Sequence, residues 1–340
     1  MIDIHCHDYP DAYREAVCDP ASGLTHYVRD DGRIVVLQDG AVSLAMPQPL
    51  PTVTERLAAM DAAGVRMQAL SVSAPNVFRM PRNMRVEVTR AVNDSFIALT
   101  RKHSDRFRAF ASLPLPNLDD ALAELERVWP RPEVAGVVLC TTIDRRTLDD
   151  PCFEPLWTAL EERRATVFVH PTTPCCTDGL TDYALALALD YLAETTLAVG
   201  RIVYSGLALR FPSIRFIFSH LGGSVPFLFH RFDNYYRQFP ECRARIDRPP
   251  SEIMRSLFFD TVTTHAPGLR CALDTFGPDQ LMFGTDYPHV PGGLDIFIRT
   301  LRSAGLDVEA SEKIEWRNAA QALGLDVTGE KSWSLASRDG

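Results

Sequence analysis

Short apolar segments rich in Val, Ile and Phe recur along the chain and are separated by longer amphipathic segments. Short apolar runs bounded by turn residues predict buried strands, and apolar positions that recur every three or four residues predict helices. We expect strands at residues 2–5, 67–72, 107–113, 134–139, 166–170, 214–220, 257–261 and 280–284. Eight strands that alternate with helices predict an α/β fold, a (β/α)8 TIM barrel rather than a doubly wound sheet.

Two of the segments between the strands carry signals of helix boundaries. Thr52, followed three residues later by Glu55, forms a capping-box pattern, and the helix that it opens should stop at Gly64. Asn117 is the expected N-cap of a helix over residues 118–128. No glycine-rich loop for a dinucleotide or a phosphate follows any predicted strand.

Two regions interrupt the alternation. Residues 26–46 carry alternating apolar residues and two Asp-Gly pairs, which predict a small β-hairpin insertion after the first strand, within about residues 20–50. Residues 229–250 are rich in Arg, Phe, Tyr and Pro and predict an excursion of loop and helix after the sixth strand. We expect one barrel domain over residues 1–327, followed by a polar tail at 328–340.

The overall composition excludes some partners. The chain of 340 residues is 46% hydrophobic and 23% charged, as is typical of a globular protein, and its formal net charge is −9. Nucleic acids and anionic membranes both need a basic face, which this composition does not predict. No apolar run approaches the ~20 residues that cross a bilayer. We therefore expect a small-molecule partner and neither a nucleic acid nor a membrane.

The first residues and the cysteines predict a cellular location. Asp3, His5, His7 and Asp8 fall where a secretory signal peptide has its apolar segment, so the first strand is expected to begin at once. The eight cysteines form no CxxC pair and show no spacing typical of a disulfide framework or a zinc finger. Both observations favour the reducing cytoplasm.

Histidine and aspartate residues occupy the ends of several predicted strands. His5 and His7 are two residues apart, so they point to the same side of the first strand and can bind one ion, although this spacing alone is weak evidence. His170, His220 and Asp286 each follow another apolar run, at the carboxyl end where barrel enzymes assemble their active sites. Strand ends from across the chain thus predict a metal site.

These motifs resemble a known superfamily. The HxH pair, the histidine after the fifth strand, "SHLGG" after the sixth and "GTDYPH" after the eighth are similar to the amidohydrolase superfamily, in particular its branch of aminocarboxymuconate-semialdehyde and γ-resorcylate-type decarboxylases. The resemblance extends from residue 2 to about residue 323. It implies that His5, His7, His170 and Asp286 bind a metal and that His220 is the catalytic histidine beside it.

The resemblance also bears on the number of metal ions. Binuclear members bridge two metals with a carboxylated lysine at the end of the fourth strand. Here that strand ends in "VAGVVLCTT", and Lys102, Lys313 and Lys331 all lie elsewhere, which implies a single ion. Cys140 lies near this position and is interpreted as a small buried apolar side chain. Three histidines and one carboxylate favour Zn2+, with Mn2+ or iron as alternatives.

Arg231 is the candidate for binding a carboxylate. It lies eleven residues after His220, and the decarboxylase branch has an arginine at this spacing that often reaches the active site of a neighbouring subunit. A guanidinium binds a carboxylate through two parallel hydrogen bonds, so the resemblance implies a substrate contact and a homodimer. Residues 41–51 depart from the branch, because the aminocarboxymuconate enzymes have a second substrate-binding arginine there and "AVSLAMPQPLP" has none. This departure argues against aminocarboxymuconate semialdehyde as the substrate.

The residues and the resemblance together predict non-oxidative decarboxylation of an aromatic or conjugated dienoic carboxylic acid. The metal would polarise the substrate, His220 and Asp286 would handle protons, and Arg231 would orient the carboxylate. Two alternatives stay open. One is a metal-dependent hydrolase or hydratase of a lactone, amide or ring-cleavage product; the other is a binding barrel with a structural metal, against which the histidine-rich ligands argue. Roles stay unassigned for the loop residues His289, Cys175 and Cys176.

Overall fold

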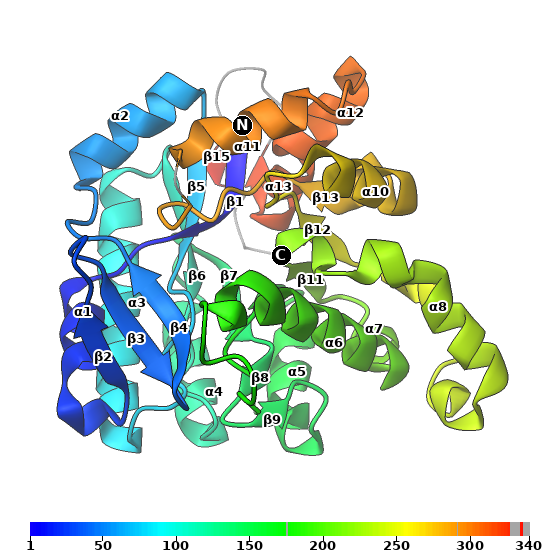
Figure 1. The fold of residues 1–340 in the computed structure, drawn as a ribbon, viewed down its shortest axis with the longest axis horizontal. Helices are drawn as coiled ribbons and strands as arrows, with labels where there is room; N and C mark the ends of the chain where they lie inside the picture. Colours follow the sequence, from blue (N-terminus) through cyan, green and yellow to red (C-terminus); the bar gives the residue numbers. More distant parts are fainter. Residues whose placement is uncertain (175, 291, 327–333, 336–340) are drawn as a thin grey trace.

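The eight predicted strands form one parallel barrel surrounded by helices (Figure 1). The structure, a computed structural model, describes residues 1–174, 176–290, 292–326 and 334–335. Neighbouring strands follow the order β1-β5-β6-β7-β10-β11-β12-β13, as expected of a (β/α)8 fold. The barrel strands are β1 (Ile2–His7), β5 (Met67–Ser71), β6 (Phe107–Ala111), β7 (Val134–Cys140), β10 (Thr166–His170), β11 (Arg215–Phe218), β12 (Phe258–Asp260) and β13 (Leu281–Met282).

The barrel closes between its first strand and the segment that follows its last strand. The Ile4 N–H donates to the Phe283 carbonyl at 2.9 Å, and the His7 N–H donates to the Tyr287 carbonyl at 2.7 Å. β13 is therefore continued by irregular backbone that still pairs with β1. This explains why the regular strand is shorter than the predicted 280–284.

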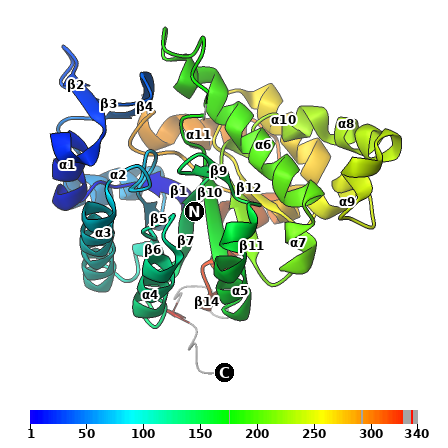
Figure 2. The same ribbon diagram turned by 90° about the horizontal axis from the view of Figure 1, so that it is seen from below.

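Apolar side chains fill the interior of the barrel at the amino ends of its strands, and the candidate site residues lie at the carboxyl ends. Ile4, Phe110, Phe168 and similar inward side chains pack into one cluster with Leu325 and other residues near the C-terminus. Figure 2 shows β14 (Leu325–Asp326) at the end of the barrel opposite to the insertion and to α6 (Tyr191–Tyr204). Only the carboxyl ends of the strands are thus available for a site.

Helices follow the strands as the pattern predicted. Thr52 accepts a hydrogen bond from the Glu55 N–H at 3.2 Å and returns one from its own N–H to Glu55 at 2.8 Å, which confirms the capping box. Asn117 is the N-cap of α4, as expected, although its side chain makes no capping hydrogen bond. The helices are α1 (Asp11–Cys18), α2 (Val53–Ala63), α3 (Arg82–Lys102), α4 (Leu118–Val128), α5 (Glu154–Glu162), α6 (Tyr191–Tyr204), α7 (Leu207–Arg210), α8 (Val225–Gln238), α9 (Pro250–Met254), α10 (Ala266–Phe276), α11 (Gly293–Arg302), α12 (Val308–Glu312) and α13 (Asn318–Ala322).

The insertion after β1 is a three-stranded antiparallel sheet rather than a single hairpin. Its strands are β2 (Thr25–Val28), β3 (Ile34–Gln38) and β4 (Ala41–Met46), and β3 pairs with both neighbours. Each Asp-Gly pair turns the chain between two of these strands, and both glycines have a positive φ. Two turns at this spacing produce two hairpins that share a strand.

Two further segments differ in detail from the sequence prediction. α8 already begins at Val225, because Pro226 in its first turn suits a helix start, so the predicted excursion at 229–250 begins inside a helix. The predicted tail at 328–340 lies outside the described residues except for β15 (Ser334–Leu335), which pairs with β14. Among the described residues, no helix combines the length and apolarity needed to cross a bilayer.

A close approach between two barrel strands gives a test of the packing. A Cβ added at Gly136 on β7 would lie 2.2 Å from the Thr166 carbonyl oxygen, which is backbone and cannot turn away. We expect Gly136→Ala to lower the free energy of unfolding by about 3 kcal/mol, measured by urea denaturation. Gly268→Ala on α10, where the nearest atom is 3.5 Å away, is the control and should be neutral or stabilising. Equal stability of both variants would contradict the close approach.

Candidate metal centre

The first strand contributes two imidazoles to the carboxyl end of the barrel. His5 and His7 are separated by one residue on β1, so their side chains leave the strand on the same side. Both are fully buried, and their Nε2 atoms lie 3.1 Å apart. Two nitrogens from one strand therefore face a single point.

Two further side chains reach this point from distant parts of the chain. His170 is the last residue of β10, and Asp286 follows β13 after a short turn. Asp286 Oδ1 lies 3.3 Å from His5 Nε2 and 3.1 Å from His7 Nε2. One ligand atom from each of these four residues lies within 4.8 Å of the others. The structure thus brings together all four residues that the sequence predicts as metal ligands.

Hydrogen bonds at the outer ring nitrogens fix how two of the imidazoles are presented. His5 Nδ1 lies 2.5 Å from Asp260 Oδ2, and His170 Nδ1 lies 2.7 Å from the Pro171 carbonyl oxygen. A carboxylate and a carbonyl only accept hydrogen bonds, so each Nδ1 carries the proton. In the neutral form of each ring, the Nε2 lone pair is then available to a metal, as in other histidine metal sites.

His7 is held in the same way by a hydroxyl group. Its Nδ1 lies 3.1 Å from Ser71 Oγ, at the end of the neighbouring strand β5. Ser71 Oγ donates its own proton to the Cys6 carbonyl at 3.2 Å, which leaves it as the acceptor for His7. All three imidazoles therefore present Nε2 to the centre.

Asp260, which sequence reasoning missed, joins several parts of the centre. It is the last residue of β12 and is fully buried. One of its oxygens contacts His5, and the other accepts hydrogen bonds from the backbone N–H of His220 at 2.8 Å and of Val262 at 2.9 Å. The available signal was an acidic residue within the predicted strand at 257–261, at the end facing the site.

A second buried carboxylate fixes the segment that carries Asp286. Asp3 accepts hydrogen bonds from the Thr285 hydroxyl at 2.6 Å and from Gln68 at 3.0 Å, and burial raises its pKa to about 6. Gly284 allows the close approach beyond β13, because a Cβ there would lie 3.0 Å from the Cβ of His5. The register between the first and last strands thus depends on Asp3 and Gly284.

The charge states suit a divalent cation. Burial lowers the pKa of His7 to about 3 and that of His170 well below its usual value, so both are neutral. Although burial opposes ionisation of Asp286, the charge of His5 and contacts with the imidazoles hold its pKa well below the usual range. Burial also acts to lower the pKa of His5, but Asp260 and Asp286 raise it to about 10. A positive charge is therefore favoured between these carboxylates.

The donor set fits a metal ion. Asp286 Oδ1 is buried and has no hydrogen-bond partner among the described residues, yet it faces the Nε2 atoms of His5 and His7. Burying such an oxygen costs free energy unless it binds a cation or accepts a hydrogen bond. Three imidazole nitrogens and this carboxylate oxygen are donor types that divalent transition-metal ions accept.

His220 lies at the edge of this centre rather than within it. Its Nε2 is 3.6 Å from Asp286 Oδ2, its ring centroid is 5.1 Å from that of His5, and its Nδ1 has no hydrogen-bond partner among the described residues. His220 has a φ of 54°, which turns the chain sharply after β11. The strained turn points the imidazole at the centre instead of along the strand.

A cavity of about 230 Å3 opens beside His170, His220 and Asp286. This volume is below the range of about 300–1,000 Å3 that is usual for ligand pockets, so it suits a ligand no larger than a single ring. His289 also lines it, and its Nε2 lies 2.5 Å from the hydroxyl oxygen of Tyr9. The cavity therefore includes a residue whose role the sequence left open. Of the two loop cysteines, Cys176 is exposed and Cys175 lies outside the described residues.

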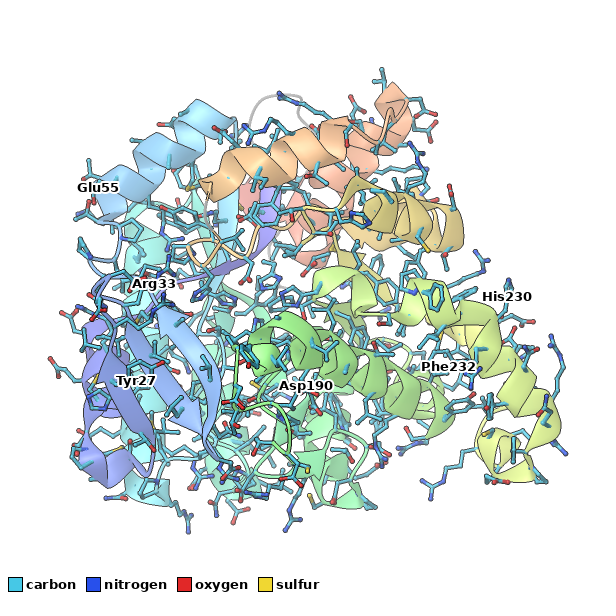
Figure 3. The ribbon with its side chains drawn as sticks, viewed as in Figure 1. Tyr27, Arg33, Glu55, Asp190, His230 and Phe232 are labelled. Atoms are coloured by element: carbon cyan, nitrogen blue, oxygen red, sulfur yellow. The ribbon has the colours of Figure 1, made fainter. Side chains whose placement is uncertain are left out.

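Arg231 does not reach this cavity within one chain. It lies on α8, where its guanidinium donates to the Tyr235 hydroxyl at 3.0 Å and covers the Tyr235 ring. Figure 3 labels its neighbours His230 and Phe232 far from the insertion. Any contact with a substrate therefore requires a second chain, as the resemblance implies.

The fold and the donor set define the class of protein: a parallel (β/α)8 barrel with a histidine and aspartate metal site at the carboxyl ends of its strands. The family model described as Amidohydrolase matches residues 2–325, and the chain belongs to this family.

Several relatives of this chain are named as decarboxylases. The chain is 29% identical over 295 residues to a 6-methylsalicylic acid decarboxylase of Penicillium expansum, with 85% of each chain covered. It is 26% identical over 247 residues to a 2-amino-3-carboxymuconate-6-semialdehyde decarboxylase of Dictyostelium discoideum, covering 71% of this chain and 67% of the relative.

Solved structures share the fold. The 5-carboxyvanillate decarboxylase of Sphingomonas paucimobilis has a TM-score of 0.82 at 24% identity, covering 95% of this chain and 98% of that chain. A dihydroxybenzoic acid decarboxylase of Polaromonas, solved with bound manganese and 2-nitroresorcinol, has a TM-score of 0.78 at 21% identity, covering 95% and 96%. These likenesses confirm the predicted barrel.

The contact between Asp260 and His5 can be tested through metal affinity. Asp260→Asn keeps the shape of the side chain but removes the charge that orients and polarises His5. We expect metal affinity to fall about 10- to 100-fold, measured by competition with a chelator. Asp233→Asn is the matched control, because Asp233 is also buried and accepts two hydrogen bonds from Ser251, but on α8. The assignment is wrong if both variants bind metal equally well.

Proposed function

We propose that the protein is a metal-dependent carboxy-lyase that removes CO2 without oxidation from an aromatic or conjugated dienoic carboxylic acid. The observation that carries this proposal is the convergence of His5, His7, His170 and Asp286 beside a cavity sized for one ring. The decarboxylase relatives support the same reaction. His5, His7, His170 and Asp286 would hold one divalent cation, which when bound supplies Lewis-acid polarisation of a substrate oxygen.

The chain's own groups handle the proton that the reaction requires. Loss of CO2 leaves an electron pair on carbon, and one proton must be delivered to that carbon. Histidine is suited to give and take protons near neutral pH. His220 lines the cavity and is 3.6 Å from Asp286, so the two residues would pass a proton between them and the substrate.

Zinc is the ion that the ligand set favours. Imidazole nitrogens with one carboxylate oxygen form the usual set of catalytic zinc sites, and manganese is the alternative because it accepts the same donors. Elemental analysis of the protein as purified distinguishes these ions.

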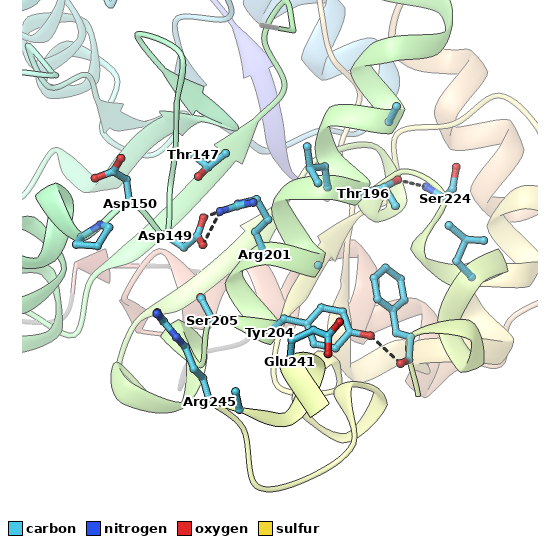
Figure 4. Close-up of a pocket in the computed structure, with 17 residues that line it drawn as sticks. Thr147, Asp149, Asp150, Thr196, Arg201, Tyr204, Ser205, Ser224, Glu241 and Arg245 are labelled. Atoms are coloured by element: carbon cyan, nitrogen blue, oxygen red, sulfur yellow. Dashed lines mark hydrogen bonds and ion pairs between the residues drawn. The ribbon is translucent and has the colours of Figure 1, made fainter. Parts of the chain in front are cut away.

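We also propose a homodimer, in which a second copy covers the surface formed by α6 and α8. Leu192 and Leu197 on α6, and Phe227 and Tyr235 on α8, are large apolar residues that are exposed in the single chain. A groove of about 880 Å3 runs between these helices and the β8 (Thr142–Ile143) and β9 (Arg146–Thr147) hairpin (Figure 4). Arg231 lies on this same surface, so a partner here would bring Arg231 toward another chain. Free cysteines favour the reducing cytoplasm as the location.

The reaction is tested with metal-loaded protein and a panel of hydroxybenzoates and carboxymuconate analogues in 18O-labelled water. We expect CO2 release without incorporation of the label into the aromatic product. His220→Asn should lower the rate about 100- to 10,000-fold and leave the metal content unchanged, since His220 handles protons and holds no metal. Label in the product without CO2 would instead indicate the hydrolase or hydratase that the family's name allows.

The dimer is tested by sedimentation velocity. Phe227 is 85% exposed on α8, so Phe227→Asp should place a charge in the interface and convert the wild-type dimer to a monomer at micromolar concentration. Val308→Asp on α12, where Val308 is 77% exposed, is the matched control and should stay dimeric. If Arg231 acts across the interface, monomeric Phe227→Asp should also lose activity. A wild-type monomer would overturn the proposal.

A further inference from the structure

The insertion supplies one wall of the cavity beside the metal centre. Ser43, Leu44 and Ala45 of β4 line it, and so does Arg33 immediately before β3. Tyr191 and two leucines near the start of α6 form the facing wall. Among the described lining residues, Arg33 has the only permanent cation. The candidate metal ligands His170 and Asp286 therefore lie on one side of the cavity, and the Arg33 guanidinium of the insertion lines another part of it.

The Arg33 side chain has hydrogen-bond capacity that the protein leaves unused. Its nearest carboxylate partner is Asp31, at 3.6 Å from Nε, which is beyond hydrogen-bond distance. The guanidinium donates no hydrogen bond to a described residue. The side chain is nevertheless only 29% exposed to solvent. The guanidinium has five N–H donors in a planar fork. Most of these donors are free for a ligand in the cavity.

The backbone that carries Arg33 is held in place. β3 pairs with β2 on one side and with β4 on the other, and the Arg33 N–H donates to Asp31 Oδ1 at 3.1 Å. The Tyr191 hydroxyl donates to the Ser43 carbonyl, which ties the insertion to α6 across the cavity. Figure 3 shows Arg33 at the upper end of the insertion, toward the barrel. The backbone from which the guanidinium extends is thus fixed before a ligand arrives.

We propose that Arg33 is a specificity-determining residue that binds a carboxylate of the substrate. This inference rests on the proposed function and narrows it: the cavity selects anionic aromatic acids over neutral rings of the same shape. A planar guanidinium facing a planar carboxylate forms two parallel charge-assisted hydrogen bonds. An arginine is absent from residues 41–51, but the same insertion then provides a carboxylate anchor from the residue before β3. Arg33 acts within the chain, in contrast to Arg231.

The electrostatics of the cavity agree with this geometry. Burial is the main cause that lowers the pKa of His289, and the charges of His5 and Arg33 lower it further, whereas Asp286 raises it. The Arg33 charge is therefore felt at a residue that shares the cavity with the metal ligands. A single-ring acid in a cavity of about 230 Å3 would be within reach of both.

The test uses salicylate and its neutral amide, salicylamide, as probes of metal-loaded protein. Binding is measured by calorimetry in the His220→Asn background, so that turnover does not consume the acid. We expect Arg33→Gln to weaken salicylate binding 10- to 100-fold and to change salicylamide binding less than twofold. Arg33→Lys keeps the charge without the fork and should fall between Arg33→Gln and the unchanged chain. A wild-type-like melting temperature verifies the fold of each variant.

Arg29→Gln is the matched control. Arg29 lies in the same insertion and pairs with the same Asp31, at 3.4 Å, but it does not line the cavity. Arg29→Gln should leave both affinities unchanged. The inference is overturned if Arg33→Gln leaves salicylate binding within twofold, if it weakens both probes equally, or if the protein with Arg33 intact does not prefer the acid. These outcomes are separate from decarboxylation. If the protein releases no CO2 but still prefers salicylate through Arg33, the proposed reaction is wrong and the proposed role of Arg33 is retained.

Discussion

The contact between Asp260 and His5 is the interaction on which the metal centre depends. A single carboxylate orients a ligand imidazole through one oxygen and holds the backbone of His220 and Val262 through the other. If Asp260 moved, the ligand on β1 and the turn that carries the catalytic candidate would move together. The position of His220 relative to the candidate metal ligand His5 is thus set by one buried side chain on a third strand, β12. Such outer partners also raise the basicity of the ligand that they orient.

Closure of the barrel completes the centre. His5 and Asp286 come from the two ends of the chain, and they meet because the first strand pairs with the segment after the last one. The Asp286 N–H donates to the His5 carbonyl at 2.8 Å, and Asp286 adopts a φ of 55°, which turns its carboxylate inward. A non-glycine residue in this region is strained, and the surrounding hydrogen bonds, including those of Asp3, must offset the strain. Folding and assembly of the ligand set are therefore the same event.

Local signals in the sequence account for the parts that could be predicted. The HxH spacing and the acids and histidines after apolar runs follow from strand periodicity and from the common end at which parallel strands terminate. Asp260 was missed because its role arises from His5, 255 residues away. Arg33 was missed because the insertion was expected to be one hairpin; with three strands, the residue before β3 comes to line the cavity. Local sequence patterns do not reveal which side chains of distant strands come into contact. They also do not reveal which side of the barrel an insertion covers.

The balance of charge explains why a guanidinium belongs at this cavity. A divalent cation among His5, His7, His170 and Asp286 would be neutralised by two carboxylates, Asp286 directly and Asp260 through His5. A carboxylate substrate would then bring an uncompensated negative charge into a buried site, where an unpaired charge is costly. Arg33 lines the cavity and supplies one positive charge without altering the metal ligands. In this arrangement the residues at the carboxyl ends of the barrel strands would carry the reaction, and Arg33 of the insertion would select the charge of the substrate.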